Sequence, residues 1–181
     1  MAGYYYILSS LPTLVFGNPP PLSHTDFLRL CTPWLSDRDA ARMELARADI
    51  ENIPTDRISH DMLEKWVFFE NTLRNEMVKM RAKNLGCREE EYLRPEMGFD
   101  ADVIALIPQA LKDPSPLQAE MNLLRIRWSF LTEHEVGHAF DLVALMIYGL
   151  KLQLLERIRK FDKEKGRQAL SLIYERSFRE G

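Results

Sequence analysis

Residues 59–85 read SHDMLEKWVFFENTLRNEMVKMRAKNL and carry the longest helical pattern of the chain. Their apolar residues recur at intervals of four, three, four, four and three: Met62, Trp66, Phe69, Leu73, Met77 and Met80. This spacing puts them on one narrow stripe, which is typical of a helix that packs along another long helix. Gly86 follows, where a left-handed residue can end a helix. The stretch therefore predicts a long helix in an all-α protein.

Within this helix, Glu70 and Arg74 are predicted to form an exposed intrahelical pair.

The first 22 residues show a different pattern. The run Tyr4-Tyr5-Tyr6-Ile7-Leu8 is rich in β-favouring residues and ends before Pro12, which predicts a short extended segment. Gly17-Asn18-Pro19-Pro20-Pro21 predicts a connector that cannot be helical. Residues 1–22 are therefore predicted to be an extended lead-in and a proline-rich connector.

Further helices are predicted from cap signals and apolar spacing. The predicted N-caps are Ser23 or Thr25, Ser36 and Ser115. Ser115 is followed by Pro116 and Gln118, which together predict a capping box. Two seams of apolar residues follow, Leu117, Met121, Leu124, Trp128 and Leu131, and then Phe140, Val143, Ile147, Leu150 and Leu154. The second helix is predicted to end near Phe161, and a last helix to begin near Asp162, with Leu170, Ile173 and Phe178 facing inward. We therefore expect residues 1–181 to form a single helical domain, a bundle of long helices.

Composition narrows the function classes. The chain has 181 residues, 46% of them hydrophobic and 28% charged, as expected for one globular domain. A net charge of -3 argues against a nucleic-acid partner. The longest apolar run, residues 142–148, is too short for a membrane span. Cys31 and Cys87 are isolated thiols without a disulfide pattern, and the N-terminus lacks a basic signal region, so we expect a cytoplasmic protein.

His134-Glu135-Val136-Gly137-His138 matches the zinc-peptidase motif H-E-x-x-H. On one helix, His134 and His138 would share a face and could bind Zn²⁺, while Glu135 would deprotonate the metal-bound water. A zinc metallopeptidase is therefore the alternative function.

Other residues favour a bend at this position. Gly137 suits the left-handed end of the preceding helix, and Asp141 or a neighbour can begin the next one. The glycine and histidine that continue the motif in one peptidase class are replaced by Asp141 and Ala144. Glu156 and Glu175 are acidic residues available as a third ligand, and nothing local singles them out. The sequence thus favours a structural turn, with no catalytic residue, metal or cofactor expected.

Several short stretches follow one another in a recognisable order along nearly the whole chain: Tyr4–Pro12, Asn71–Arg74, Arg81–Gly86, Pro116–Glu120, Arg127–Leu131, Gly137–Asp141, Tyr148–Gln153 and Glu156–Arg157. In these stretches the chain resembles a bacterial family of unknown function that accompanies the subunits of V-type ATPases. Members of that family look like short relatives of the C subunit of V-type ATPases, which is called d in eukaryotes.

The resemblance implies a non-catalytic subunit of a bacterial V/A-type rotary ATPase that transports protons or sodium ions. In such an ATPase the C subunit links the central stalk to the membrane proteolipid ring, so the stalk and the ring are the implied partners. The implied location is cytoplasmic, peripheral to the inner membrane through the complex. Full-length C subunits are considerably longer than this chain, so it can supply only part of their funnel of helices.

Overall fold

The computed structural model describes residues 2–49, 58–94 and 101–177, and within these ranges it contains helices and no strand. The elements are α1 (Ala2–Ser10), α2 (His24–Cys31), the short 3-10 helix η1 (Thr32–Trp34), α3 (Asp37–Leu45), α4 (Asp61–Leu85), α5 (Ala101–Leu111), α6 (Pro116–His134) and α7 (Leu142–Ser177). The predicted all-α class is confirmed.

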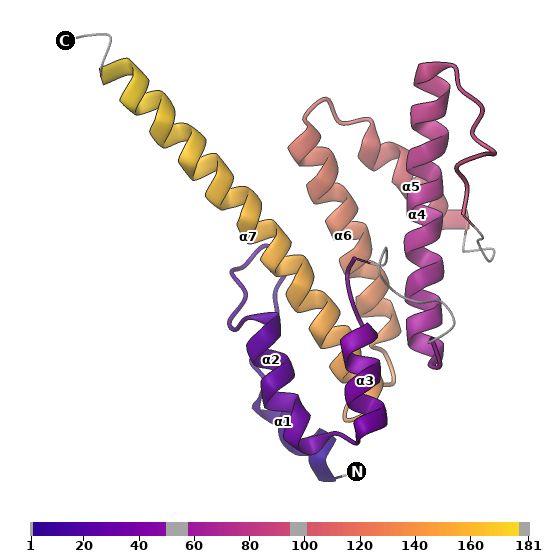
Figure 1. Ribbon diagram of the computed structural model, residues 1–181, viewed down its shortest axis with the longest axis vertical. Helices are drawn as coiled ribbons and strands as arrows, with labels where there is room; N and C mark the ends of the chain where they lie inside the picture. The colour runs from indigo at the N-terminus through magenta and orange to yellow at the C-terminus, as the bar shows by residue number, and fades with distance from the viewer. Residues whose placement is uncertain (1, 50–57, 95–100, 178–181) are drawn as a thin grey trace.

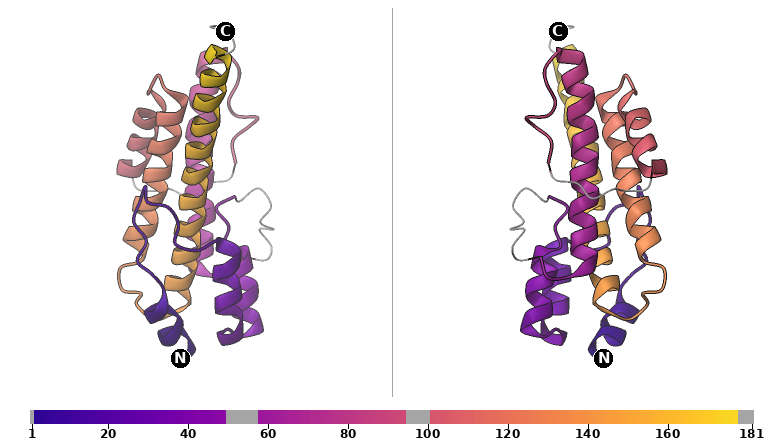
Figure 2. Two further views of the ribbon diagram at one scale, coloured as in Figure 1. Left: turned by 90° about the vertical axis from the view of Figure 1, so that its left-hand side faces the viewer. Right: turned by 90° about the vertical axis from the view of Figure 1, so that its right-hand side faces the viewer.

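The three longest helices determine the shape of the molecule. α4 and α7 run in the same direction and α6 runs in the opposite one (Figure 1). α1, α2, α3 and the turn between α6 and α7 gather at the end where the chain begins, as two further views show (Figure 2). The core contains the most deeply buried side chains of these helices, among them Trp66, Phe69, Leu124, Leu131, Leu145 and Ile147.

Short-range signals determine the helix ends. Ser23, Ser36 and Ser115 each cap a helix by accepting a backbone N–H at 3.1, 3.2 and 3.4 Å, as predicted. Gly86 ends α4 with a φ of 68°, which is also as predicted. Gln118 does not complete the capping box, because its side chain donates to Asn122 instead.

The N-terminal segment corrects the extended prediction. Residues 2–10 form α1, because tertiary packing overrides the weak β preference of tyrosine and isoleucine. Ile7 is buried in the core, and the hydroxyl of Tyr4 donates a hydrogen bond of 2.8 Å to Asp39. The connector that follows is non-helical, as predicted, and Gly17 adopts a φ of 87°.

The C-terminal part also differs from expectation. α7 continues through Asp162 and Gly166 as one helix of 36 residues. Both are poor helix formers, but each weakens a helix by only about 0.5–1 kcal/mol, and no proline interrupts the sequence. Phe140 precedes α7 and is exposed, so it does not belong to the predicted seam. The predicted inward orientation of Leu170, Ile173 and Phe178 lies outside the described side chains.

Candidate functional site

The H-E-x-x-H residues lie in the turn between α6 and α7. α6 ends at His134, and Gly137 has a φ of 89°, in the left-handed region. Asp141 then caps α7, since its Oδ1 accepts a hydrogen bond of 2.9 Å from the backbone N–H of Ala144. The predicted left-handed bend is confirmed. His134 and His138 therefore do not lie one turn apart on a single helix, the arrangement that would give them a common face.

Each imidazole of the motif has a different neighbour. Nδ1 of His134 lies 2.9 Å from the carbonyl oxygen of Phe130, and the two rings are 4.2 Å apart. Nδ1 of His138 lies 2.6 Å from Oδ2 of Asp141. Burial alone would raise the pKa of Asp141, but its hydrogen bonds with His138 and the amide of Ala144 outweigh burial and lower this pKa. The turn is thus held by its own polar contacts.

A third metal ligand is also missing from this turn. Glu156 accepts a hydrogen bond of 2.8 Å from the backbone N–H of His24, and the side chain of Glu175 lies outside the described residues. In the part of the chain that the structure describes, no three His, Cys, Asp or Glu side chains are placed to hold a metal ion. The described residues around this turn thus lack the three protein ligands that a catalytic zinc site needs.

Glu135, the acid of the motif, pairs with a buried lysine. Its Oε2 lies 2.5 Å from Nζ of Lys151 on α7, and only 8% of the Lys151 side chain is exposed. Nζ also lies 5.2 Å from the centre of the Trp128 ring. A buried ammonium group requires a counter-charge, which Glu135 provides. This pairing favours a structural role for Glu135 over general-base catalysis.

The turn lines a cavity of about 300 Å³ together with residues 11–14 of the connector. The hydroxyl of Tyr148 donates a hydrogen bond of 2.9 Å to the carbonyl oxygen of Pro12, and burial raises the pKa of Tyr148 to about 12. The ionisable groups that line the cavity all have partners within the chain: Glu135, His138, Tyr148 and Lys151. These contacts tie the cavity wall to the turn, to α7 and to the connector.

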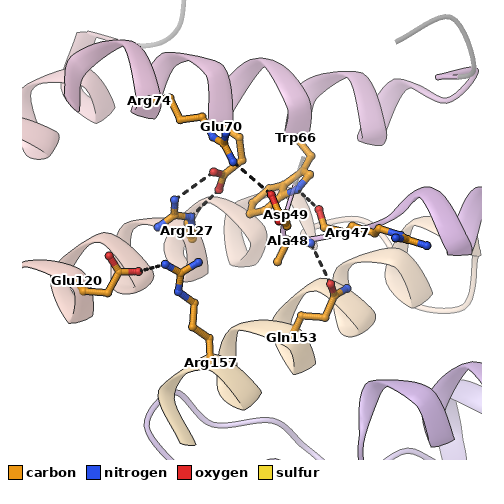
Figure 3. A network of polar contacts seen from close by, with 10 residues as sticks. All are labelled: Arg47, Ala48, Asp49, Trp66, Glu70, Arg74, Glu120, Arg127, Gln153 and Arg157. Atoms are coloured by element: carbon orange, nitrogen blue, oxygen red, sulfur yellow. Dashed lines mark hydrogen bonds and ion pairs between the residues drawn. The ribbon is translucent and has the colours of Figure 1, made fainter. Parts of the chain in front are cut away.

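A polar network joins α4, α6 and α7 (Figure 3). Glu70 of α4 accepts two hydrogen bonds from Arg127 of α6, at 2.6 and 3.1 Å. Two turns earlier on α6, Glu120 lies 2.6 Å from Arg157 of α7. Burial alone would lower the pKa of Arg127, but the charges of Glu70 and Glu120 and the hydrogen bonds outweigh burial and raise it. α6 is thus linked by charge to both of its long neighbours.

The predicted exposed pair between Glu70 and Arg74 is wrong. Glu70 is only 1% exposed and faces Arg127, whereas Nη2 of Arg74 lies 3.4 Å from Asp49. Packing of α6 against α4 brings Arg127 to Glu70 across 57 residues of sequence, and the planar guanidinium binds both carboxylate oxygens. A pattern confined to one helix cannot reveal this partner.

The segment after α3 adds a second set of contacts to the same network (Figure 3). Nε1 of Trp66 donates to the carbonyl oxygen of Arg47 at 2.9 Å. The backbone N–H of Ala48 donates to Gln153 at 3.0 Å, and the amide nitrogen of Gln153 donates to the carbonyl oxygen of Ala46 at 2.9 Å. Residues 46–48 thus connect α4 with α7 through their backbone.

Exposed aromatic residues gather at the end where α1 and the α6–α7 turn meet. We call Tyr5, Tyr6, Trp34 and Phe140 the aromatic end surface; they are 59%, 59%, 47% and 49% exposed. The rings of Tyr5 and Phe140 are 4.7 Å apart, as are those of Tyr6 and Trp34. Clustered exposed aromatic side chains mark interaction sites more often than they mark ordinary surface.

The sequence contains a signal for this surface that the extended interpretation missed. Tyr4, Ile7, Leu8 and Leu11 recur at helical spacing, and all four pack at or against the core. On a helix with that buried face, Tyr5 and Tyr6 point outward. Trp34 and Phe140 join them only through the fold.

Comparison of the chain with protein-family models, curated proteins and solved structures found no match. Among the residues described, none of the helices combines the length and the apolar character that crossing a membrane requires.

Proposed function

We propose that this protein is a non-catalytic component of a bacterial V/A-type rotary ATPase, similar in role to the C subunit. In this proposal a single helical domain, built as a bundle of long helices, couples the central stalk to the membrane proteolipid ring during proton or sodium transport. It lies on the cytoplasmic side of the inner membrane and is held there by other subunits of the complex. The resemblance of the ordered sequence stretches supplies the identity of the assembly.

The observation that carries the subunit role is the aromatic end surface. Four exposed aromatic rings at one end of the molecule give a large contact area at low conformational cost, as in interface hot spots. The backbone that carries these rings is held in place, because Ile7 anchors α1 in the core and Asp141 caps α7 beside Phe140. We infer that this end docks on another subunit.

Affinity purification from membranes of the source cells tests the proposal. A tagged chain is expected to recover proteins of the central stalk and the proteolipid ring, identified by mass spectrometry. The variant Tyr5→Ser/Phe140→Ser removes one of the two contacting ring pairs and is expected to lower this recovery at least about tenfold, since interface hot-spot residues contribute about 2 kcal/mol or more each.

The matched control is Leu85→Ser, which removes an exposed apolar side chain at the end of α4. Recovery should be unchanged in this variant. If the wild-type chain recovers no part of the ATPase, the proposed assembly is wrong. Unchanged recovery with Tyr5→Ser/Phe140→Ser would instead show that the aromatic end surface is not the contact.

The zinc-peptidase alternative is not carried further. The bend at Gly137 ends the helix between His134 and His138, and no group of three metal-ligating side chains is found among the described residues.

A further inference from the structure

A cavity of about 290 Å³ lies beside the second half of α4, where the loop after this helix runs alongside it (Figure 1). Its lining combines three arginines with apolar and amide side chains: Arg74, Arg81, Arg94, Asn75, Met77, Val78 and Tyr92. None of the described lining residues carries a carboxylate, although the same loop contains three glutamates at positions 89–91. The cavity is therefore strongly cationic in a chain whose net charge is -3.

One buried side chain fixes the loop against α4. Asn75 is only 1% exposed, and its Nδ2 donates a hydrogen bond of 2.9 Å to the carbonyl oxygen of Arg94. The backbone N–H of Arg94 donates in return to Oδ1 of Asn75, also at 2.9 Å. This reciprocal pair holds the backbone of Arg94 in place, and Arg94 lines the cavity from the loop while Arg81 lines it from α4.

The charges of the cavity are unevenly compensated. Arg74 faces Asp49 at 3.4 Å. Arg81 and Arg94 are exposed and have no ion-pair partner among the residues that the structure describes. Two such arginines beside one cavity should attract anions strongly. Each planar guanidinium can donate two hydrogen bonds to one carboxylate or phosphate.

The shape of the lining narrows the class of ligand. Arg81 lies on α4 and Arg94 on the loop after it, so each can bind an acidic group of its own. The same cavity is also lined by Met77, Val78 and Tyr92, and Tyr92 is 64% exposed. These residues suit an apolar side chain. A volume of about 290 Å³ is also several times the volume of one water molecule, about 30 Å³, and so exceeds what a single small anion needs.

We propose that this cavity binds an acidic protein segment, in which two carboxylates flank an apolar residue. Arg81 and Arg94 each bind one carboxylate, and Tyr92 with Met77 covers the apolar side chain. The cavity and the aromatic end surface share no residue, so the two proposals stand or fall separately.

Fluorescence anisotropy with the purified full chain tests this site. The probe is a short labelled peptide in which glutamate alternates with leucine, and the matched peptide has glutamine in place of glutamate. We expect binding of the Glu–Leu peptide only. Arg81→Gln/Arg94→Gln should weaken it about tenfold for each arginine, because each substitution removes a charged hydrogen bond.

The control is Lys83→Gln/Arg88→Gln, which changes the net charge equally at exposed positions outside the lining. It should weaken binding less than about twofold, because long-range charge effects are screened by salt. Circular dichroism checks that both variants remain helical. An equal loss in the control, equal binding of both peptides, or no binding to the wild-type chain would overturn the proposal. If inorganic phosphate at the same concentration as the peptide displaces the peptide, the cavity binds phosphate, and the proposal is overturned as well.

Discussion

Two of the ion pairs that join α6 and the turn after it to the neighbouring helices differ in their access to water. Glu70 and Arg127 meet in the interior between α4 and α6, where their side chains are 1% and 11% exposed. Glu135 and Lys151 meet at the turn, where the lysine is buried but 43% of the glutamate side chain is exposed. Removing one partner should therefore destabilise the fold more at the interior pair than at the turn, because a charge without a partner is less costly where water can reach it.

The largest effect is expected from Glu70→Ala. This substitution leaves Arg127 charged and buried, with Nη1 already lacking a hydrogen-bond partner among the described residues. Loss of one member of a buried pair typically costs about 3–5 kcal/mol, so the free energy of unfolding should fall by that amount. Urea denaturation followed by circular dichroism measures it.

The double variant Glu70→Leu/Arg127→Met sharpens this prediction. It removes both charges and replaces them with apolar side chains of comparable length, so we expect its free energy of unfolding to lie within about 1 kcal/mol of the wild type. If the double variant is as unstable as Glu70→Ala, the effect comes from packing and not from an uncompensated charge.

A smaller effect is expected from Glu135→Ala. Lys151 then loses its counter-charge, but it lies beside the cavity of the turn and keeps the Trp128 ring as a neighbour. The free energy of unfolding should fall by about 1–3 kcal/mol, measured by the same denaturation. Glu133→Ala, an exposed position nearby, should change it by no more than about 0.5 kcal/mol. If Glu135→Ala lowers the free energy of unfolding as much as Glu70→Ala does, the two pairs do not differ in the way proposed.

The smallest effect concerns Asp141, the cap of α7 beside the second pair. Its pKa is lowered in the folded state, so its carboxylate stabilises the fold above the unfolded-state pKa of about 3.9, and this stabilisation is lost as the pH falls through the folded-state pKa. Asp141→Asn keeps the cap but removes the charge. Since the side chain is 46% exposed, the difference should stay below about 1 kcal/mol.

Denaturation of wild type and Asp141→Asn from about pH 7 down to about pH 3 measures this difference. The free energy of unfolding should decrease less steeply with acidification in the variant, because one stabilising carboxylate is absent at every pH. Parallel curves would show that the charge of Asp141 does not contribute.

Local rules predicted much of the fold. Ser36, Ser115 and Gly86 were placed correctly, because capping depends on residues within one turn of the helix end. The bend at Gly137 followed from the same reasoning, and it separated the histidines of the motif. For the candidate site, the sequence thus predicted the turn.

Long-range contacts were not predictable in this way. The sequence pairs Glu70 with Arg74 because it reveals only neighbours on the same helix, whereas the partner Arg127 lies on another helix. Lys151 likewise gave no sign that Glu135 would pair with it. The sequence predicts an extended segment where α1 forms, because β propensity reflects burial as much as backbone preference, and burial is decided by the whole fold.

α7 has a mechanical consequence that follows from its length. At 1.5 Å per residue, its 36 residues form a rod about 54 Å long, and the part up to Ile158 is fastened to the rest of the molecule by buried side chains. Because the end of a long helix lies far from its buried part, a small tilt of the buried part displaces the end by a larger distance. A force applied near Ser177 would therefore act on the ion pairs of Lys151 and Arg157, which join α7 to the turn and to α6.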